Sequence, residues 1–207
     1  MDQVIGSGPN DRKRDRQAAV DWARELLAKD PRSWVILDTE TTGLTNAEIL
    51  QIGILWPDGT VALDVLLEPD FDRIGGTIPP GATAIHGITD AMVSGCCLKL
   101  TDILEGMERI LWDRTVVVFN KQYDHTILHG CIDHRCGDDE HLVAKVWLAS
   151  SKWECAMLPY AAFIGDWNEY RGNYKWQKLP ASDHSAIGDC RATLAIIKQM
   201  AADEVTA

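Results

Sequence analysis

The pattern of hydrophobic and polar positions predicts a helix and then a meander of strands in the first third of the chain. Apolar residues recur near helical spacing over residues 12–29, which predicts an amphipathic helix that ends at Asp30-Pro31. Residues 34–38 form a short apolar run bounded by turn residues, as expected of a buried strand. Residues 49–56 and 61–67 fit two further strands joined by a tight turn. The sheet is therefore expected to begin as an antiparallel meander.

The remainder of the chain alternates between predicted helices and strands. Residues 69–95 are rich in glycine and proline and are expected to form a long loop. The elements predicted after this loop are a helix at 99–112, a strand at 115–119, a helix at 123–130, a short strand followed by a helix at 153–164, and a helix at 187–202. Residues 142–148 fit either a strand or a helix. Hairpin strands followed by strands that alternate with helices predict an α/β domain around a mixed sheet.

A chain of 207 residues is expected to fold as one domain, because a single core can grow to this size. We expect an N-terminal tail and amphipathic helix at residues 1–33, with disorder over residues 1–11, and a main domain at residues 34–207. No apolar run approaches the roughly 18 residues needed to span a bilayer, and the polar N-terminus lacks a signal-peptide core. These features predict a cytoplasmic protein with no membrane partner and with its six cysteines reduced.

The net charge narrows the classes of function. The formal net charge is −11, and residues 1–33 carry seven Lys/Arg against six Asp/Glu, so residues 34–207 carry −12. Proteins that coat long stretches of duplex are usually basic, because neutralising phosphates supplies much of their affinity. An acidic protein still acts on nucleic acid where bound divalent cations meet the phosphate. The charge therefore argues against a coating protein and permits a metal-dependent nuclease.

Two acids stand where the first predicted strand ends, in the segment DTETTGL at 38–44. Because strand side chains alternate between faces, Asp38 and Glu40 project from the same side. Two acids in this position are unfavourable unless a cation lies between them. Hard divalent cations such as Mg²⁺ and Mn²⁺ prefer oxygen ligands, so the pair favours one of these ions. The alternative is a solvated strand end followed by a turn.

Two further segments place an acid at the start of a predicted helix. Asp124 lies one helical turn beyond Asn120, shortly after the strand at 115–119. An acid in such a position is also common as a cap favoured by the helix dipole. Asp189 falls in the first turn of the last predicted helix, and His184 lies on the segment that enters it. Taken alone, each segment is also compatible with an ordinary helix start.

In this order, the three segments resemble the motifs of the DnaQ-like, or DEDDh, exonuclease family. Its motifs are matched by DTETTGL at 38–44, NKQYD at 120–124 and HSAIGD at 184–189. HGI at 86–88 and EILQIG at 48–53 resemble further family segments, and one departure is Phe119 where the family often has histidine. The resemblance covers roughly residues 34–200. It implies a ribonuclease H-like α/β fold with a central mixed sheet of about five strands flanked by helices.

The resemblance also implies a two-metal mechanism with Mg²⁺ or Mn²⁺. The implied metal ligands are Asp38, Glu40, Asp124 and Asp189. His184 is the implied general base, since an imidazole exchanges protons near neutral pH. The residues implied to bind substrate are Thr41, Thr42, Leu44, His86, Ile88 and Asn120. The expected reaction is 3′→5′ hydrolysis of single-stranded nucleic acid or frayed 3′ ends to nucleoside 5′-monophosphates, with DNA favoured over RNA.

An alternative function is a catalytically idle scaffold or polymerase-associated module, and a polymerase or a second copy of the chain stays open as a partner. Histidines and cysteines gather between residues 129 and 141, where Cys131, His134 and Cys136 have a spacing that could hold zinc.

Eight of the fifteen aromatic residues lie between 147 and 176, with basic residues among the later ones. Such a segment serves either core packing or base stacking. We expect the part around residues 170–178 to lie near the site.

Overall fold

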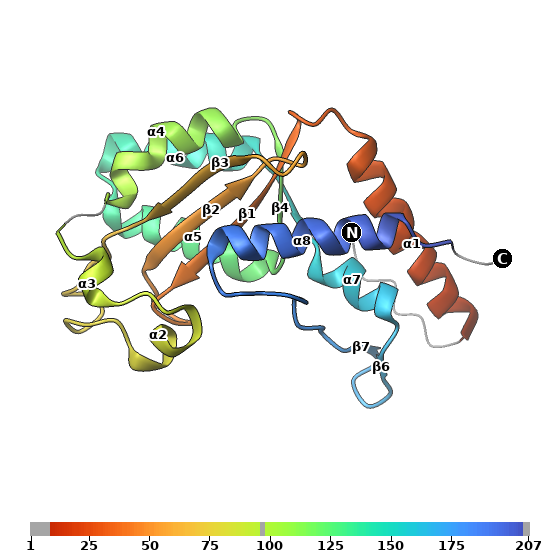
Figure 1. The fold of residues 1–207 in the computed structure, drawn as a ribbon. Helices are drawn as coiled ribbons and strands as arrows, with labels where there is room; N and C mark the ends of the chain where they lie inside the picture. The colour runs from red at the N-terminus through yellow and green to blue at the C-terminus, as the bar shows by residue number, and fades with distance from the viewer. Residues whose placement is uncertain (1–8, 96–97, 205–207) are drawn as a thin grey trace.

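The computed structural model describes residues 9–95 and 98–204, and it is built around a five-stranded sheet of order β3-β2-β1-β4-β5 (Figure 1). The strands are β1 (Trp34–Thr41), β2 (Ile49–Leu55), β3 (Val61–Leu66), β4 (Thr115–Val118) and β5 (Lys152–Cys155). β1, β2 and β3 pair antiparallel, whereas β4 pairs parallel with both β1 and β5. The mixed sheet predicted from the sequence is confirmed.

Helices cover both faces of this sheet (Figure 1). One face carries α4 (Leu100–Leu111), α5 (Lys121–Arg135) and α6 (Asp138–Ser150), and the other carries α1 (Pro9–Ala28), α7 (Met157–Ile164) and α8 (Ala186–Ala201). The side chains of β1 point alternately to the two faces of the sheet. Val35 and Leu37 enter the core under α4, α5 and α6, whereas Trp34 and Ile36 pack with α1, α7 and α8. β1 is therefore a central strand buried on both sides, which explains its unbroken apolar run.

The segment between β3 and α4 differs from the predicted long loop. Residues 69–95 contain two short helices, α2 (Pro80–His86) and α3 (Asp90–Val93). Pro80 suits the first turn of α2 because its φ is already fixed near the helical value, and Gly87 ends this helix with a φ of 74°. The expectation of a loop without helices was wrong because helices this short show no repeated apolar period.

Other boundaries also differ from the predictions. α5 runs beyond the predicted end at residue 130, and residues 142–148 lie within α6, which decides the alternative between strand and helix. A small hairpin of β6 (Trp167–Asn168) and β7 (Asn173–Tyr174) has no predicted counterpart. Of the residues expected to be disordered, 1–8 lie outside the described part of the chain, and Pro9 begins α1.

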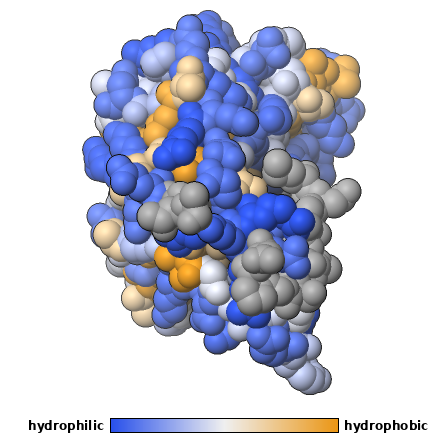
Figure 2. All heavy atoms as spheres, turned by 90° about the vertical axis from the view of Figure 1, so that its right-hand side faces the viewer, coloured by the Kyte–Doolittle hydropathy of each residue, from blue (hydrophilic) through white to orange (hydrophobic). Residues whose placement is uncertain are grey.

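α1 shares its apolar core with α7 and α8. Val20, Ala23 and Leu26 are fully or almost fully buried in this core. Arg16 forms an ion pair of 3.0 Å with Asp203, which links α1 to the segment after α8. Figure 2 shows this end of the molecule as mainly hydrophilic, with small and separate hydrophobic areas. Among the helices that the structure describes, none is long and apolar enough to cross a membrane.

Candidate active site

The end of β1 carries Asp38 and Glu40 toward the face of the sheet that α8 covers. The two acids continue the alternation of Trp34 and Ile36, whose side chains pack with α8. The strand was predicted to end at Asp38, but β1 runs to Thr41, with a register shift against β2 at its last residue. Backbone pairing with β2 therefore fixes both carboxylates within the sheet.

A glycine on β2 allows α8 to reach these carboxylates. Asp38 pairs with Gly53 across the two strands. A Cβ added at Gly53 would lie 2.7 Å from the carbonyl carbon of Ala186, so a larger residue would displace the start of α8. On the same face of β2, Gln51 Oε1 accepts a hydrogen bond of 3.1 Å from the Ala186 backbone nitrogen. The first turn of α8, which contains Asp189, is therefore seated beside Asp38.

Asp189 meets the two acids of β1 from this helix. One carboxylate oxygen of each of Asp38, Glu40 and Asp189 lies within 4.8 Å of the other two, close enough to share an ion. Ser182 Oγ donates a hydrogen bond of 2.8 Å to Asp189 Oδ2. Asp189 Oδ1 is buried and has no hydrogen-bond partner among the described residues. Because a buried carboxylate oxygen is costly without a partner, this group of oxygen donors fits a hard divalent cation.

Asp124 approaches the same acids from the first turn of α5. Its side chain is only 3% exposed, and Oδ1 accepts a hydrogen bond of 2.9 Å from Thr39 Oγ1. Asp124 is outside the group of three oxygens within 4.8 Å, but it lies close enough for its charge to act on Asp38. Thr39 was not among the predicted site residues, although the sequence places it between the two acids of β1.

The crowding of these acids changes how they titrate. Burial, and after it the charges of the other three acids, raises the pKa of Asp38 well above its ordinary value. Burial and neighbouring carboxylates, of which Asp189 has the largest effect, raise the pKa of Glu40 to about 8. Burial also raises the pKa of Asp124 to about 7, although the hydrogen bond from Thr39 acts in the opposite direction. These shifts are those of carboxylates gathered without a positive charge between them.

His184 lies on the exposed segment that leads into α8. Its backbone φ of 56° is in the left-handed region, which residues with a side chain seldom adopt. The turn is held by Asp183, whose Oδ1 accepts a hydrogen bond of 3.0 Å from the Ser185 backbone nitrogen. His184 Nδ1 lies 3.3 Å from Ser182 Oγ, the group that donates to Asp189. Ser182 thus connects the histidine to the acids, and nothing in the sequence pattern distinguished it.

The histidine of the HGI segment holds the loop that follows β1. His86 Nδ1 accepts a hydrogen bond of 3.0 Å from the Ile88 backbone nitrogen, so the ring proton is on Nε2, which lies 3.2 Å from the Thr41 carbonyl oxygen. Burial lowers the pKa of His86, the hydrogen bond to Thr41 opposes this, and the nearby His184 lowers it further. His86 and Thr41 therefore lie together near His184. The Ile88 side chain is instead buried in a small apolar cluster below the loop.

The other predicted substrate residues lie around this loop and beside α5. Thr42 Oγ1 accepts a hydrogen bond of 2.9 Å from the Glu48 backbone nitrogen, which closes the loop, and Leu44 within it is 82% exposed. A cleft of about 290 Å³ is lined by Leu44, Asn120, Gln122, Tyr123, Thr126, Ile127 and Trp176. Tyr123 was not predicted as a site residue. Its hydroxyl donates a hydrogen bond of 2.6 Å to the Gly43 carbonyl oxygen, and its place next to Asp124 was the signal that could have identified it.

Among the described residues, Cys131, His134 and Cys136 do not form a group whose ligand atoms all lie within 4.8 Å of one another. Within the described residues, a second group with ligand atoms close together is Glu48, Cys131 and His134. Its carboxylate already has cationic partners, with Arg73 at 3.3 Å and Arg135 at 3.6 Å. Two arginines beside the acid make this group a structural ion-pair network that links the residue before β2 to α5 and to the segment after β3.

Comparison with known proteins gives one clear relative. The chain is 31% identical over 179 residues to the "Uncharacterized exonuclease CP81" of Escherichia phage 186, and the match covers 81% of this chain and 87% of that protein. No protein-family model matches the chain.

Among solved structures, the fold is similar to exonuclease I. The structure of Escherichia coli exonuclease I in complex with a dT13 oligonucleotide matches with a TM-score of 0.59 and 16% identity over 80% of this chain. Exonuclease I of Methylocaldum szegediense matches with a TM-score of 0.59 and 19% identity over 79% of this chain. This chain spans about 40% of the length of those proteins. At these identities the likeness shows the fold alone.

The sheet order and the helices on both faces define a ribonuclease H-like fold, and a carboxylate cluster lies at the end of β1. The relative from Escherichia phage 186 is an exonuclease that matches most of this chain, so the chain belongs to the DnaQ-like exonucleases. Its substrate is therefore nucleic acid.

Proposed function

We propose that the protein is a 3′→5′ exonuclease of the DEDDh type, which releases nucleoside 5′-monophosphates from the 3′ end of single-stranded nucleic acid, with DNA favoured over RNA. The observation that carries this proposal is the cluster of Asp38, Glu40 and Asp189, with Asp124 beside it. The three motifs that supply these acids, in the order of the DEDDh family, support the direction of hydrolysis. The single strand held by exonuclease I, which has a similar fold, supports the choice of substrate.

Four acids are available to hold two Mg²⁺ or Mn²⁺ ions. Asp38, Glu40 and Asp189 are close enough to hold one ion, and Asp124 and Asp38 would hold the other. The partnerless Oδ1 of Asp189 supports this assignment, because the described residues give that buried oxygen no other partner. Two such ions stabilise the charge on the attacking and leaving oxygens of an in-line displacement.

His184 is the proposed general base. Ser182 uses its one hydroxyl proton in the hydrogen bond to Asp189, so it can only accept a hydrogen bond from His184 Nδ1. This arrangement favours the neutral tautomer with the proton on Nδ1 and leaves Nε2 free to take a proton from water. The exposed position of His184 allows it to reach a substrate phosphate held beside the carboxylates.

The predicted substrate contacts belong to the loop after β1, to the HGI segment that holds this loop, and to the start of α5. Leu44 is exposed beside the cleft, and Asn120 lies on the wall formed by the start of α5. The carbonyl group of Thr41 is held by His86 at the end of β1. The terminal nucleotide would be positioned by Thr41, Thr42, Leu44 and Asn120. Ile88 is buried beneath the loop and would instead fix the position of His86, to which its backbone nitrogen donates a hydrogen bond.

The test is hydrolysis of single-stranded DNA and RNA labelled at the 5′ end, with Mg²⁺ or Mn²⁺ present. The wild-type protein should shorten DNA one nucleotide at a time from the 3′ end and should lose activity with EDTA. Glu40→Gln should lower the rate by more than about 100-fold, because it removes a charge that holds the metal. The matched control is Glu105→Gln on the exposed side of α4, which should keep the wild-type rate. Release from the 5′ end, internal cleavage, or full activity of Glu40→Gln would contradict the proposal, and complete inactivity would favour the idle scaffold.

A further inference from the structure

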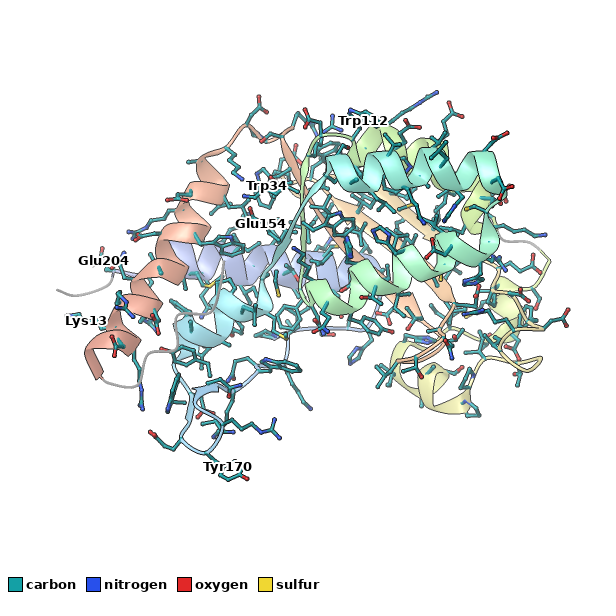
Figure 3. All side chains as sticks on the ribbon, turned by 180° about the vertical axis from the view of Figure 1, so that it is seen from behind. Lys13, Trp34, Trp112, Glu154, Tyr170 and Glu204 are labelled. Carbon is teal, nitrogen blue, oxygen red and sulfur yellow. The ribbon has the colours of Figure 1, made fainter. Side chains whose placement is uncertain are left out.

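Trp176 presents a large apolar surface to solvent beside the proposed active site. It lies between β7 and α8 and is 66% exposed, although it lines the same cleft as Leu44 and the start of α5. Large aromatic side chains are usually well buried, so an indole exposed in a cleft is a candidate contact for a ligand. The β6–β7 hairpin that precedes it projects from the body of the molecule, with Tyr170 at its tip (Figure 3).

The lining of the cleft matches the two chemical surfaces of a nucleobase. Trp176, Leu44 and Ile127 provide apolar surface, and the side-chain amides of Asn120 and Gln122 provide donors and acceptors. A nucleobase has two flat apolar faces and a polar edge. Base stacking on an exposed aromatic side chain tolerates any sequence, because every base has such a face.

The cleft is connected to the active site through Tyr123. This residue lines the cleft, and its hydroxyl contacts Thr41 and donates to the Gly43 carbonyl in the loop after β1. The next residue along α5 is Asp124. A base in the cleft would therefore belong to the same strand whose phosphate lies at the carboxylates.

Two exposed lysines lie next to lining residues of the cleft in the sequence, in a body whose net charge is negative. Lys121 stands between two of the lining residues at the start of α5, and Lys178 follows Trp176 by two positions. Both side chains are exposed. Residues 34–207 carry a net charge of −12, so lysines in these positions provide local complementarity to a phosphate backbone.

We propose that Trp176 stacks on a base of the bound single strand upstream of the terminal nucleotide and so determines how tightly the enzyme holds a strand longer than one nucleotide. This subsite rests on the proposed function. It would place the affinity for long substrates at Trp176, on the wall of the cleft that the terminal nucleotide does not use.

Two substrates separate this subsite from the catalytic centre. The p-nitrophenyl ester of thymidine 5′-monophosphate contains one nucleotide, which Leu44 and Asn120 would hold, whereas an eight-nucleotide oligo(dT) also reaches Trp176. Trp176→Ala should raise KM for oligo(dT) by about 5- to 100-fold and leave kcat/KM for the ester unchanged. Trp176→Phe should keep most of the affinity, because a phenyl ring still stacks. Trp112→Ala is the matched control, since Trp112 is also exposed but lies on the opposite side of the molecule from the hairpin (Figure 3).

Equilibrium binding of fluorescent oligo(dT) in Ca²⁺ tests the subsite independently of turnover. The expected result is weaker binding by Trp176→Ala than by wild type and Trp112→Ala, with equal thermal midpoints of unfolding for all three proteins. Equal binding by wild type and Trp176→Ala would overturn the subsite, as would an equal loss on both substrates. Lack of hydrolysis by the wild-type protein would instead refute the proposed function, and in that case the binding result still decides the role of Trp176.

Discussion

At the scale of single residues, the acids of the cluster make the free energy of unfolding of the metal-free protein depend on pH. The pKa values of Glu40 and Asp124 are raised to about 8 and about 7, and that of Asp38 is raised as well. The principal cause is burial, with repulsion between the acids added to it. The folded protein therefore keeps protons that the unfolded chain releases at roughly pH 4.

This difference predicts that the metal-free protein becomes less stable as the pH rises. Between about pH 4 and pH 8 the folded state binds more protons than the unfolded state, so the free energy of unfolding must fall with increasing pH. Urea unfolding in EDTA should show a lower stability at pH 8 than at pH 5.5, and Mg²⁺ or Mn²⁺ should restore much of the loss. Asp38→Asn should be more stable than wild type at pH 8. A pH-independent free energy of unfolding, or a destabilised Asp38→Asn, would contradict this account.

His184 gives the second prediction at the residue scale. If it takes the proton from the attacking water, His184→Ala should lower kcat by roughly 10²- to 10⁴-fold, with little change in KM. The pH–rate profile decides the role, because the rate of the wild type is expected to rise toward neutral pH and the variant should lose this rise. Ser182→Ala should retain more activity than His184→Ala, since it removes only the group that orients the ring. The same rise in the His184→Ala profile would assign it to another group.

The contact between β2 and α8 positions the site at the scale of whole elements. The backbone of α8 contacts Gly53 at the start of the helix. The Ala186 backbone nitrogen, at that start, donates a hydrogen bond to Gln51 Oε1. Ser185 caps the helix by accepting a hydrogen bond of 3.1 Å from the Gly188 backbone nitrogen. These contacts, far apart in the sequence, set the distance between Asp38 on the strand and Asp189 on the helix.

Gly53→Ala should therefore impair catalysis through the position of α8. The added methyl group would force the helix away from β2, with a destabilisation of about 1–3 kcal/mol. Activity should fall by at least about tenfold, because metal ligands tolerate little displacement. The matched control is Gly106→Ala in α4, where a Cβ meets no atom within 4 Å and where alanine should preserve or slightly increase stability. Thermal unfolding and initial rates of both variants provide the test, and a fully active Gly53→Ala would refute this role.

For the molecule as a whole, charge limits how it can hold its substrate. The main body carries −12, and the basic residues near the cleft are few, so only two or three phosphates should be neutralised by the protein. For a single strand, this gives a slope of log K against log salt of roughly −1.5 to −2. The measurement is binding of 3′-end oligonucleotides in Ca²⁺ from low to moderate salt. A slope near −5, or tighter binding to internal duplex than to ends, would show a basic surface that the fold does not suggest.

The sequence by itself determined the order of the main elements and the chemistry of the site. The apolar runs of β1 and β4 and the periodic pattern of α8 identify them because long or fully buried elements repeat their pattern over many residues. Short elements such as α2, α3 and the β6–β7 hairpin carry no such pattern, and neighbouring elements decide their conformation. The four acids and the histidine of the three motifs were also evident before the fold, since their residue types suit metal binding and proton transfer and their order resembles that of the DEDDh motifs.

Only the tertiary structure decided how these residues are brought together. Thr39 is an ordinary strand residue until α5 places Asp124 against it, and Gly53 is an ordinary glycine until α8 rests on it. Ser182 and Tyr123 acquire roles in the same way, through contacts with Asp189 and with the loop after β1. The physical reason is that residue type fixes what a side chain can donate, accept or ligate. Which partner it meets depends on the packing of elements far apart along the chain.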